Sequence, residues 1–540
     1  MTEVILGKIT KEALDNNIDE LIKNKIASRI AKKDYTIWGK EAEDESSKRL
    51  GWVDLPETSQ KLVEPILAKK KELNEKGVNR IVLCGMGGSS LAPEVITQTY
   101  GVDLVVLDST DPEQIHGVVS KDLEKTAVVV SSKSGSTLET DSQKRTFEKL
   151  FKEANIDATE RIIIVTDPGS PMEKKAKEDG YAIFQADPEV GGRYSALTAF
   201  GLVPSGLAGV DIKELLDHAG KARAAVLEDT KDNPALALGV AMAGTKPLRD
   251  KTVLVEDGSG IVGFPDWTEQ LIAESTGKDQ TGVLPVVVNE GDFETKHELP
   301  DTVIARLQKD AKADNLGDDQ FAVAGCLGEQ MYLWEYATAI AGYLLGINPF
   351  DQPDVESAKQ AARNLLDKGV SEDTAKPVLS DEGVEVYASS HAEKVISGAK
   401  TIAEVVEKLT SAIDDKEGYL AIQAYLDREK YTELDAVREE AAEYAKRPVT
   451  FGWGPRFLHS TGQYHKGGKP VGVFLQVTGT YNEDIEIPGL NFTFGQVIVA
   501  QAGGDANVLN DLGRPVVTLH LTDTATGVKT LTNTFANLKG

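Results

Sequence analysis

The sequence has few cysteines and few basic residues for its length. Only Cys84 and Cys326 occur among 540 residues, which excludes a disulfide framework and indicates a reducing compartment. The chain has 59 Lys and Arg residues against 86 Asp and Glu residues, so its formal net charge is −27. An acidic excess of this size repels phosphate backbones and anionic lipids, which argues against a nucleic-acid or membrane partner.

Long apolar runs are also absent. The most apolar helical stretch, residues 336–347, is too short to cross a bilayer. The N-terminal residues 1–15 lack the basic start and the apolar core of a signal peptide. At about 100–200 residues per domain, the length corresponds to about two to four domains. These features predict a cytoplasmic, multidomain enzyme.

The spacing of apolar residues divides the chain into a helical start and two larger regions. Residues 1–78 show the periodicity of helices. From residue 79 on, short Val- and Ile-rich runs alternate with helical stretches, which is typical of doubly wound parallel sheets. We expect an α/β fold with a first domain over 79–245 and a second domain over 246–540, which helices interrupt at about 328–413 and which ends in a histidine-bearing segment.

Each domain contains its own series of predicted strands. In the first domain they cover residues 80–85, 104–108, 126–132 and 161–167. In the second domain they cover residues 251–257, 283–288, 419–426, 470–479 and 514–521. Both series read as strands of parallel sheets.

A glycine-rich turn follows the first predicted strand. Residues 85–90 read GMGGSS and stand directly before a helix. Glycines let a backbone approach a ligand closely, and a helix N-terminus offers free N–H groups to an anion. A dinucleotide site is an alternative because Asp108 ends the next strand, but Ser90 replaces the third glycine of G-x-G-x-x-G. A turn that serves packing only is the other alternative.

A hydroxyl-rich turn follows the third predicted strand. Residues 131–140 read SSKSGSTLET. Hydroxyl and N–H groups at this place can bind phosphate without a metal, and the following helix adds its dipole. A helix cap with solvated serines is the alternative. Because both turns fall at the carboxyl edge of one sheet, where open α/β sheets bind ligands, they predict a phosphate site.

Six segments together resemble the sugar isomerase domain and, more specifically, the phosphoglucose isomerase family. They are CGMGGSS (84–90), SSKSGSTLET (131–140), GGRYSALTAFG (191–201), EQLIAESTGKDQTG (269–282), GINPFDQPDVESAK (346–359) and FLHSTGQYHKGG (457–468). Residues 37–56 also resemble a segment near the start of the family's chains. The resemblance implies an isomerase that interconverts glucose 6-phosphate and fructose 6-phosphate, in glycolysis and gluconeogenesis, through ring opening and a cis-enediol. It implies no metal and no organic cofactor.

The resemblance also implies four catalytic side chains. Glu274 corresponds to the base that moves a proton between neighbouring carbons, and Arg193 to the cation beside the developing enediolate. Lys359 and His459 correspond to the lysine and the histidine that assist ring opening. An exposed helical lysine is the alternative for Lys359, and His465 in the same loop is the alternative histidine.

Substrate-binding residues follow from the same segments. The resemblance implies Ser89, Ser132, Ser134, Thr137, Gly192, Gln270 and Gln352. The serines and the threonine would bind the phosphate. Lys133 either adds charge to this site or faces solvent.

The order of the segments departs from the usual one. Most family members have the histidine segment between the glutamate and lysine segments, whereas here the order is Glu274, Lys359, His459. The isomerase half of transaldolase–isomerase fusions has this same order, and the length corresponds to that half alone. The family's histidine comes from the neighbouring subunit of a dimer. The resemblance therefore implies a homodimer and leaves open which subunit supplies His459. Asp354, where glycine is common, is a smaller departure.

Other functions are possible alternatives. A non-catalytic sugar-phosphate binding protein would need the hydroxyl-rich turn, but it would have no reason to keep the four catalytic residues together. A nucleotide-dependent oxidoreductase would use residues 85–90 and Asp108, and binding of NAD(P) would distinguish it. A transaldolase is disfavoured because no segment has the length of a barrel.

Overall fold

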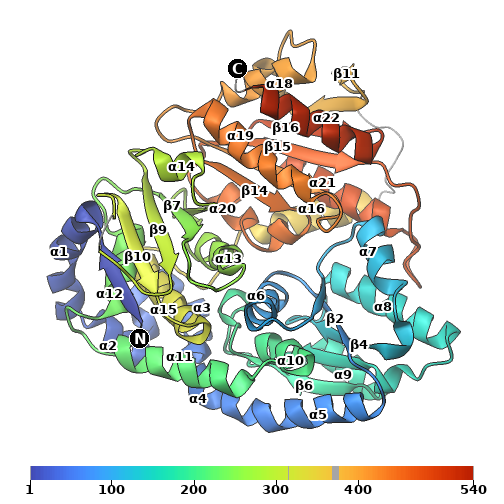
Figure 1. Cartoon of the computed structure of the whole chain (residues 1–540), viewed down its shortest axis with the longest axis horizontal. Coiled ribbons are helices and arrows are strands. Elements are labelled where there is room, and N and C mark those ends of the chain that lie inside the picture. Colours follow the sequence, from blue (N-terminus) through green and yellow to red (C-terminus); the bar gives the residue numbers. More distant parts are fainter. Residues whose placement is uncertain (1, 314–315, 368–375, 539–540) are drawn as a thin grey trace.

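Three β-sheets form the framework of the protein (Figure 1). The computed structural model describes residues 2–313, 316–367 and 376–538, and the strands within these ranges fall into two five-stranded sheets and one six-stranded sheet. Parallel pairing dominates all three, and helices cover them. The α/β class with parallel sheets, predicted from the alternation of apolar runs and helical stretches, is confirmed.

The first sheet is entirely parallel and has the strand order β3-β2-β4-β5-β6. Its strands are β2 (Arg80–Gly85), β3 (Val105–Leu107), β4 (Thr126–Ser131), β5 (Ile162–Thr166) and β6 (Ala182–Gln185). The helices that accompany it are α5 (Val63–Glu75), α6 (Leu91–Tyr100), α7 (Pro112–Val119), α8 (Leu138–Glu153), α9 (Pro171–Asp179) and α10 (Ala199–Ala208). Its strands β4 and β5 are buried along their whole length because both faces of the sheet are covered there.

The second sheet has the order β1-β10-β9-β7-β8, and only β1 is antiparallel to its neighbour. Its strands are β1 (Glu3–Leu6), β7 (Lys251–Glu256), β8 (Leu284–Val288), β9 (Thr302–Gln308) and β10 (Gln320–Ala324). The surrounding helices are α1 (Lys8–Lys23), α2 (Ile26–Ala31), α3 (Glu43–Ser46), α4 (Leu55–Thr58), α11 (Ile212–Val226), α12 (Pro234–Ala243), α13 (Phe264–Thr276), α14 (Phe293–Lys296) and α15 (Leu327–Leu345). The start of the chain thus adds a strand to a distant sheet, although helical periodicity dominates its first 78 residues.

The third sheet has the order β11-β12-β16-β15-β13-β14. Its strands are β11 (Leu379–Asp381), β12 (Val384–Ala388), β13 (Tyr419–Tyr425), β14 (Val449–Trp453), β15 (Gly472–Gly479) and β16 (Val516–Leu521). Helices α17 (Ser390–Val395), α18 (Ile402–Thr410), α19 (Ala436–Ala445), α20 (Gly462–Gly467), α21 (Phe494–Asp511) and α22 (Thr524–Asn537) belong to the same region. We call residues 376–538 the third-sheet unit. Helix α16 (Val355–Asp367) precedes it and packs along α21.

The strands predicted after residue 246 therefore belong to two sheets. Periodicity predicts that a segment is a strand, but strand partners are chosen by contacts between distant segments. The region 328–413, predicted as helical, also contains β11 and β12. The predicted domain boundaries stay a prediction.

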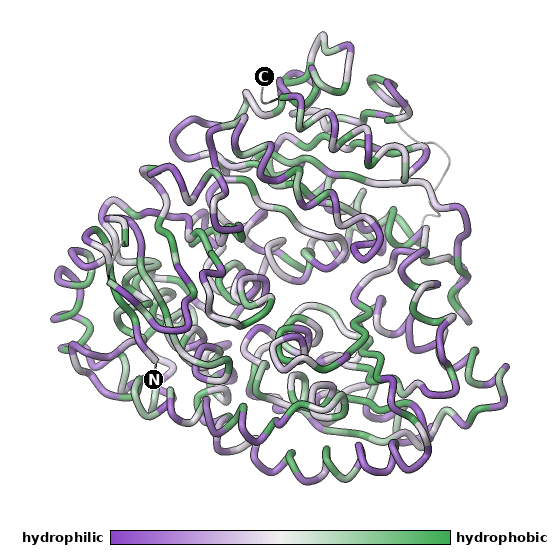
Figure 2. Tube along the Cα trace, viewed as in Figure 1, coloured by the Kyte–Doolittle hydropathy of each residue, from purple (hydrophilic) through white to green (hydrophobic). Residues whose placement is uncertain are grey.

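Apolar contacts join the third-sheet unit to the other two sheets. Tyr464 and Phe474 pack with Val253 and Val286 of the second sheet. Ile487, Phe494 and Val497 belong to the core cluster that covers one face of the first sheet. Figure 2 shows the hydrophobic residues along the inner strands and hydrophilic residues on the outer helices. None of the helices in the described ranges combines the length and apolar character that a membrane crossing requires.

Candidate active site

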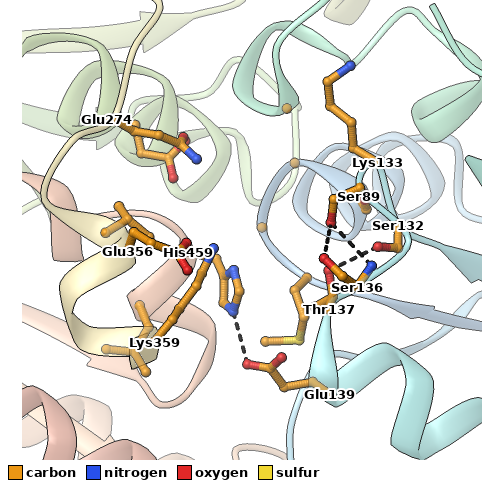
Figure 3. Close-up of a pocket in the computed structure, with 18 of the residues that line it drawn as sticks. Ser89, Ser132, Lys133, Ser136, Thr137, Glu139, Glu274, Glu356, Lys359 and His459 are labelled. Atoms are coloured by element: carbon orange, nitrogen blue, oxygen red, sulfur yellow. Dashed lines mark hydrogen bonds and ion pairs between the residues drawn. The ribbon is translucent and has the colours of Figure 1, made fainter. Parts of the chain in front are cut away.

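A cavity of about 890 Å³ lies between the three sheets, and Figure 3 shows a close-up of it. Its walls come from the carboxyl edge of the first sheet, from α13, from α16 and from the third-sheet unit. All eleven residues that the sequence analysis assigns to catalysis or substrate binding line this cavity: Ser89, Ser132, Ser134, Thr137, Gly192, Arg193, Gln270, Glu274, Gln352, Lys359 and His459. The fold thus brings six separate segments of the sequence to one place.

Glu274 and Arg193 form a buried ion pair in this cavity. Arg193 Nε lies 3.2 Å from Glu274 Oε2, and each residue is 4% exposed. Burial raises the pKa of the Glu274 carboxyl, because a charge loses solvation there, while Arg193 acts in the opposite direction. A carboxylate with a raised pKa, beside a fixed guanidinium, can accept and return a proton near neutral pH. Gln270 Nε2 lies 3.4 Å from Glu274 Oε2, one helical turn away on α13.

Two cations hold the loop before α16. Arg193 donates to the carbonyl oxygen of Asp351 and, over 2.7 Å, to Gln352 Oε1. The buried Lys278 amine donates over 2.7 Å to the Asp351 carbonyl oxygen and over 2.6 Å to its carboxylate. Burial lowers the pKa of Lys278 to about 8, and the nearby Arg193 charge acts in the same direction. The loop that presents Gln352 and Lys359 is therefore fixed to the segment that carries Glu274.

Asp354 ties this loop to the histidine segment. Its carboxylate accepts a hydrogen bond of 2.7 Å from Gln463 Nε2, and its N–H donates to Gln463 Oε1. Gln463 Nε2 also donates to the carbonyl oxygen of Gly277. A glycine at position 354 could not make the side-chain contact, so this departure from the family pattern gives the chain an additional link.

His459 faces a carboxylate from the far side of the cavity. Its Nε2 lies 3.1 Å from Glu139 Oε1, as the dashed line in Figure 3 shows. Gln501 Nε2 donates to the same carboxylate oxygen over 2.7 Å, and Thr110 Oγ1 donates to Gln501 Oε1 over 2.7 Å. Burial raises the pKa of Glu139, but the charge and hydrogen bond of His459, a backbone hydrogen bond and the Lys359 charge together outweigh burial, so the pKa is lowered. The imidazole is thus oriented by a chain of buried polar groups.

Glycines of the first turn allow the segments to approach closely. Gly87 has φ +57°, and a Cβ there would lie 2.7 Å from the His459 carbonyl oxygen and 2.9 Å from Gln270 Nε2. A Cβ on Gly88 would lie 2.0 Å from the Gly192 carbonyl oxygen. The glycine-rich turn therefore packs against the histidine and arginine segments, besides offering the N-terminus of α6.

The hydroxyl-rich turn forms the other wall. Ser132 Oγ and Thr137 Oγ1 lie 3.0 Å apart, and Ser134 Oγ lies 2.9 Å from Ser136 Oγ. Thr137 precedes α8, and its side chain makes no hydrogen bond to the backbone of that helix. Hydroxyl groups and a helix N-terminus that face one cavity can bind a phosphate dianion.

Lys359 reaches the cavity from α16, and Figure 3 shows its amine beside the His459 ring. Its charge lowers the pKa of both Glu139 and Glu274, so it lies within electrostatic range of both carboxyls. Lys133 also lines the cavity, but its amine lies 2.5 Å from Asp167 Oδ2 and points away from the hydroxyl cluster (Figure 3). Of the two lysines that the sequence suggests for this site, Lys359 is the one whose charge acts on Glu139 and Glu274.

The structure also shows where His465 and Asp108 lie, the two residues that the sequence offers as an alternative histidine and as a nucleotide-binding acid. His465 is 2% exposed and contacts the Tyr419 hydroxyl at 3.0 Å, and burial lowers its pKa well below the ordinary value. It does not line the cavity. Asp108 is 1% exposed and forms ion pairs with Arg428 and Arg456. It is therefore not available to a nucleotide ribose.

No role is predicted from the sequence for Glu139, Gln501 or Lys278. Glu139 lies in the segment SSKSGSTLET, and Lys278 lies in EQLIAESTGKDQTG. The family resemblance thus identified both segments but not the contacts of these two residues. Gln501 lies on α21 and had no local signal, because its partner Glu139 is 362 residues away in the sequence.

The fold and the site define a class of enzyme: an aldose–ketose isomerase that acts on a sugar phosphate. Residues 57–281 match the family model described as phosphoglucose isomerase. The chain is 32% identical over 360 residues to a probable glucose-6-phosphate isomerase of Methanococcus maripaludis, which covers 56% of this chain and 82% of the relative. It is 30% identical over 399 residues to a glucose-6-phosphate isomerase of Enterococcus faecalis, which covers 60% of this chain and 89% of the relative.

A solved structure shares the fold. The glucose-6-phosphate isomerase of Chlamydia trachomatis superposes with a TM-score of 0.52 at 19% identity, covering 66% of this chain and 86% of that one. The chain belongs to the phosphoglucose isomerase family. The resemblance that the six segments carry is thereby confirmed.

Proposed function

We propose that this chain interconverts glucose 6-phosphate and fructose 6-phosphate through ring opening and a cis-enediol. The observation that carries the proposal is the buried Glu274–Arg193 pair, which faces one cavity with the hydroxyl-rich turn and with the His459–Glu139 pair. A phosphate site, a carboxylate base, a fixed cation and an imidazole are the groups that this chemistry requires.

The proposed ring opening uses His459 and Lys359. His459, oriented by Glu139, gives a proton to the ring oxygen as the ring C–O bond breaks, and the proton that the 1-hydroxyl loses returns to the imidazole. Lys359 adds positive charge where oxygen charge develops. The Glu139 carboxylate, 3.1 Å from His459 Nε2, holds the imidazole in place for this transfer.

The proposed isomerisation uses Glu274 and Arg193. Glu274 takes the proton from C2 of the open-chain aldose, and the electron pair moves through C1 onto the carbonyl oxygen. Arg193 stabilises the resulting enediolate charge. Glu274 then returns the proton to C1, and the 2-hydroxyl proton passes to the negatively charged O1 as the ketone forms at C2. Raised by burial, the pKa of Glu274 suits both directions of transfer.

Substrate recognition is proposed to start from the phosphate. Ser89, Ser132, Ser134 and Thr137 would donate hydrogen bonds to its oxygens, while Gln270 and Gln352 and the backbone at Gly192 would contact the sugar. The cations Arg193 and Lys359 supply local positive potential in a chain with a net charge of −27.

We also propose that the protein is a homodimer and that it is located in the cytoplasm. The family resemblance supports a homodimer, although the chain's own His459 lines its own cavity. Cys84 and Cys326 are free thiols, which supports a cytoplasmic location because thiols persist in reducing compartments.

The Glu274→Gln variant tests the proposed function. It keeps the size and hydrogen-bonding reach of the side chain but cannot accept the proton, so kcat should fall by about 10²- to 10⁴-fold. A raised melting temperature in the presence of fructose 6-phosphate should persist, because the phosphate turn is untouched. Formation of fructose 6-phosphate from glucose 6-phosphate is measured in a coupled assay.

Glu335→Gln is the matched control. Glu335 is also buried in a helix, α15, and burial raises its pKa well above the ordinary value, the same direction as for Glu274. It does not line the cavity. Full turnover is expected for this variant, and full turnover of Glu274→Gln would contradict the proposed function.

A further inference from the structure

A buried cluster of four charges joins the third-sheet unit to the first sheet. Arg428 Nη2 lies 2.7 Å from Glu94 Oε1, and Arg428 Nε lies 3.5 Å from Asp108 Oδ1. Arg456 forms an ion pair with the other oxygen of Glu94, and its Nε lies 3.3 Å from Asp108 Oδ2. Each arginine therefore bridges both carboxylates. All four side chains are 15% exposed or less.

The cluster crosses between parts of the chain that are far apart in sequence. Glu94 lies on α6 and Asp108 directly follows β3, so both carboxylates belong to the first sheet's layer. Arg428 follows β13, and Arg456 opens the 3₁₀ turn that ends at His459 (Arg456–His459). One arginine of the cluster thus stands three residues before the catalytic histidine, within the same turn.

The charges inside the cluster depend on one another. Burial raises the pKa of the Glu94 carboxyl, but Arg456 and Arg428 outweigh burial and lower it below the ordinary value. Removing one partner of a buried ion pair leaves an uncompensated charge, which shifts or loosens its surroundings. A change at Arg456 is therefore expected to move the turn that it opens.

Helices α13 and α8 hold the other end of the same turn. The His459 carbonyl oxygen accepts a hydrogen bond of 2.8 Å from Gln270, and its ring contacts Glu139. Arg456 makes a second link between this turn and the first sheet's layer, at the start of the turn, through Glu94 and Asp108.

We propose that the cluster of Glu94, Asp108, Arg428 and Arg456 is the positioning device for His459, and that it completes the active site within a single chain. The inference rests on the proposed ring-opening role of His459. Arg456 is a positioning residue, which acts through His459 and does not touch the substrate. Asp108, which the sequence alone suggests as a nucleotide-binding acid, has its place in this cluster.

A double-mutant cycle between Arg456→Met and His459→Asn tests the proposal. Arg456→Met should lower kcat by about 10- to 100-fold, because a displacement of about 1 Å at a catalytic group has an effect of this size. KM for glucose 6-phosphate should change little, since the ion pairs of the cluster among the described residues do not include the phosphate turn at 132–137. In the double variant, kcat should equal that of His459→Asn alone.

Arg438→Met is the matched control. Arg438 is a buried arginine of the same third-sheet unit, and it pairs with Asp292 at 2.6 Å and Glu294 at 2.8 Å beside the second sheet. This variant should lower the melting temperature as Arg456→Met does, but kcat should fall by less than about twofold. Its effect should also add to that of His459→Asn.

The outcomes separate the proposal from the proposed function. If kcat of the double variant falls below that of His459→Asn by the whole factor that Arg456→Met causes in the wild type, the cluster does not act through His459. This result would overturn the inference and leave the proposed function intact. An unimpaired His459→Asn would overturn the role of the histidine and the inference together. Where Arg456→Met does not fold, the conservative variants Arg456→Lys and Asp108→Asn take its place in the cycle, with a smaller loss of kcat that must still vanish in the His459→Asn background.

Discussion

Replacing Gly87 with alanine is expected to lower both stability and turnover, for two physical reasons that a second variant can separate. The first reason is the backbone, because Gly87 has φ +57°. A residue with a Cβ loses about 1–2 kcal/mol in the left-handed region. The second reason is contact, because the new Cβ would lie 2.7 Å from the His459 carbonyl oxygen and 3.0 Å from its Cβ.

The contact sets the larger part of the expected effect. Non-bonded carbon atoms prefer separations of about 3.5–4.0 Å, so the His459 segment must retreat by about 0.5–1 Å. Overpacking of this kind costs about 1–3 kcal/mol, which brings the total loss of unfolding free energy to about 2–5 kcal/mol. Displacing His459 by this distance should lower kcat by about 10- to 100-fold.

Gly101→Ala is the control for the backbone. Gly101 caps α6 with φ +65°, and a Cβ there would meet nothing within 4 Å. It should lose only about 1–2 kcal/mol and keep its kcat. Urea unfolding gives the free energies, and a coupled assay of fructose 6-phosphate formation gives kcat. If Gly87→Ala and Gly101→Ala behave alike in both measurements, the contact with His459 has no functional weight and the reasoning is refuted.

Three further results are expected. Lys359→Met should move the acid limb of kcat/KM to higher pH, because the Lys359 charge lowers the pKa of Glu274, and an unmoved limb would contradict this. Thr137→Val should raise KM by about tenfold or more at nearly constant kcat, since one hydrogen bond to a charged group contributes about 1.5–3 kcal/mol; a loss confined to kcat would exclude a phosphate contact. Lys278→Met should remove a pH dependence of stability. The pKa of Lys278 is lowered from 10.5 to about 8, so the folded protein loses this proton before the unfolded protein does as pH rises. Between these two pH values, the unfolding free energy of the wild type should therefore increase relative to that of the variant by about 1.4 kcal/mol per pH unit. Parallel urea-unfolding curves for wild type and variant across this range would contradict it.

Local patterns in the sequence were sufficient for the class of fold and for the residues that meet in the cavity. Apolar runs of Val and Ile predicted buried parallel strands such as β4 and β5, because strands covered on both faces need apolar side chains throughout. The two turns at 85–90 and 131–140 predicted a phosphate site, because glycine, hydroxyl groups and helix N-termini act over a few neighbouring residues. The six family segments then pointed to the catalytic groups.

Only the tertiary structure decided how these groups support one another. His459 meets Glu139 across 320 residues, and Arg456 meets Glu94 across 362. Such pairs depend on which strands become neighbours, and periodicity carries no information about that choice. The division of the later strands over two sheets is of the same kind, as is the burial of Asp108 between two arginines. The sequence by itself determined the chemical groups of this isomerase. The packing of the third-sheet unit against the first sheet decided that one chain holds them all, because only that contact brings His459 into the cavity.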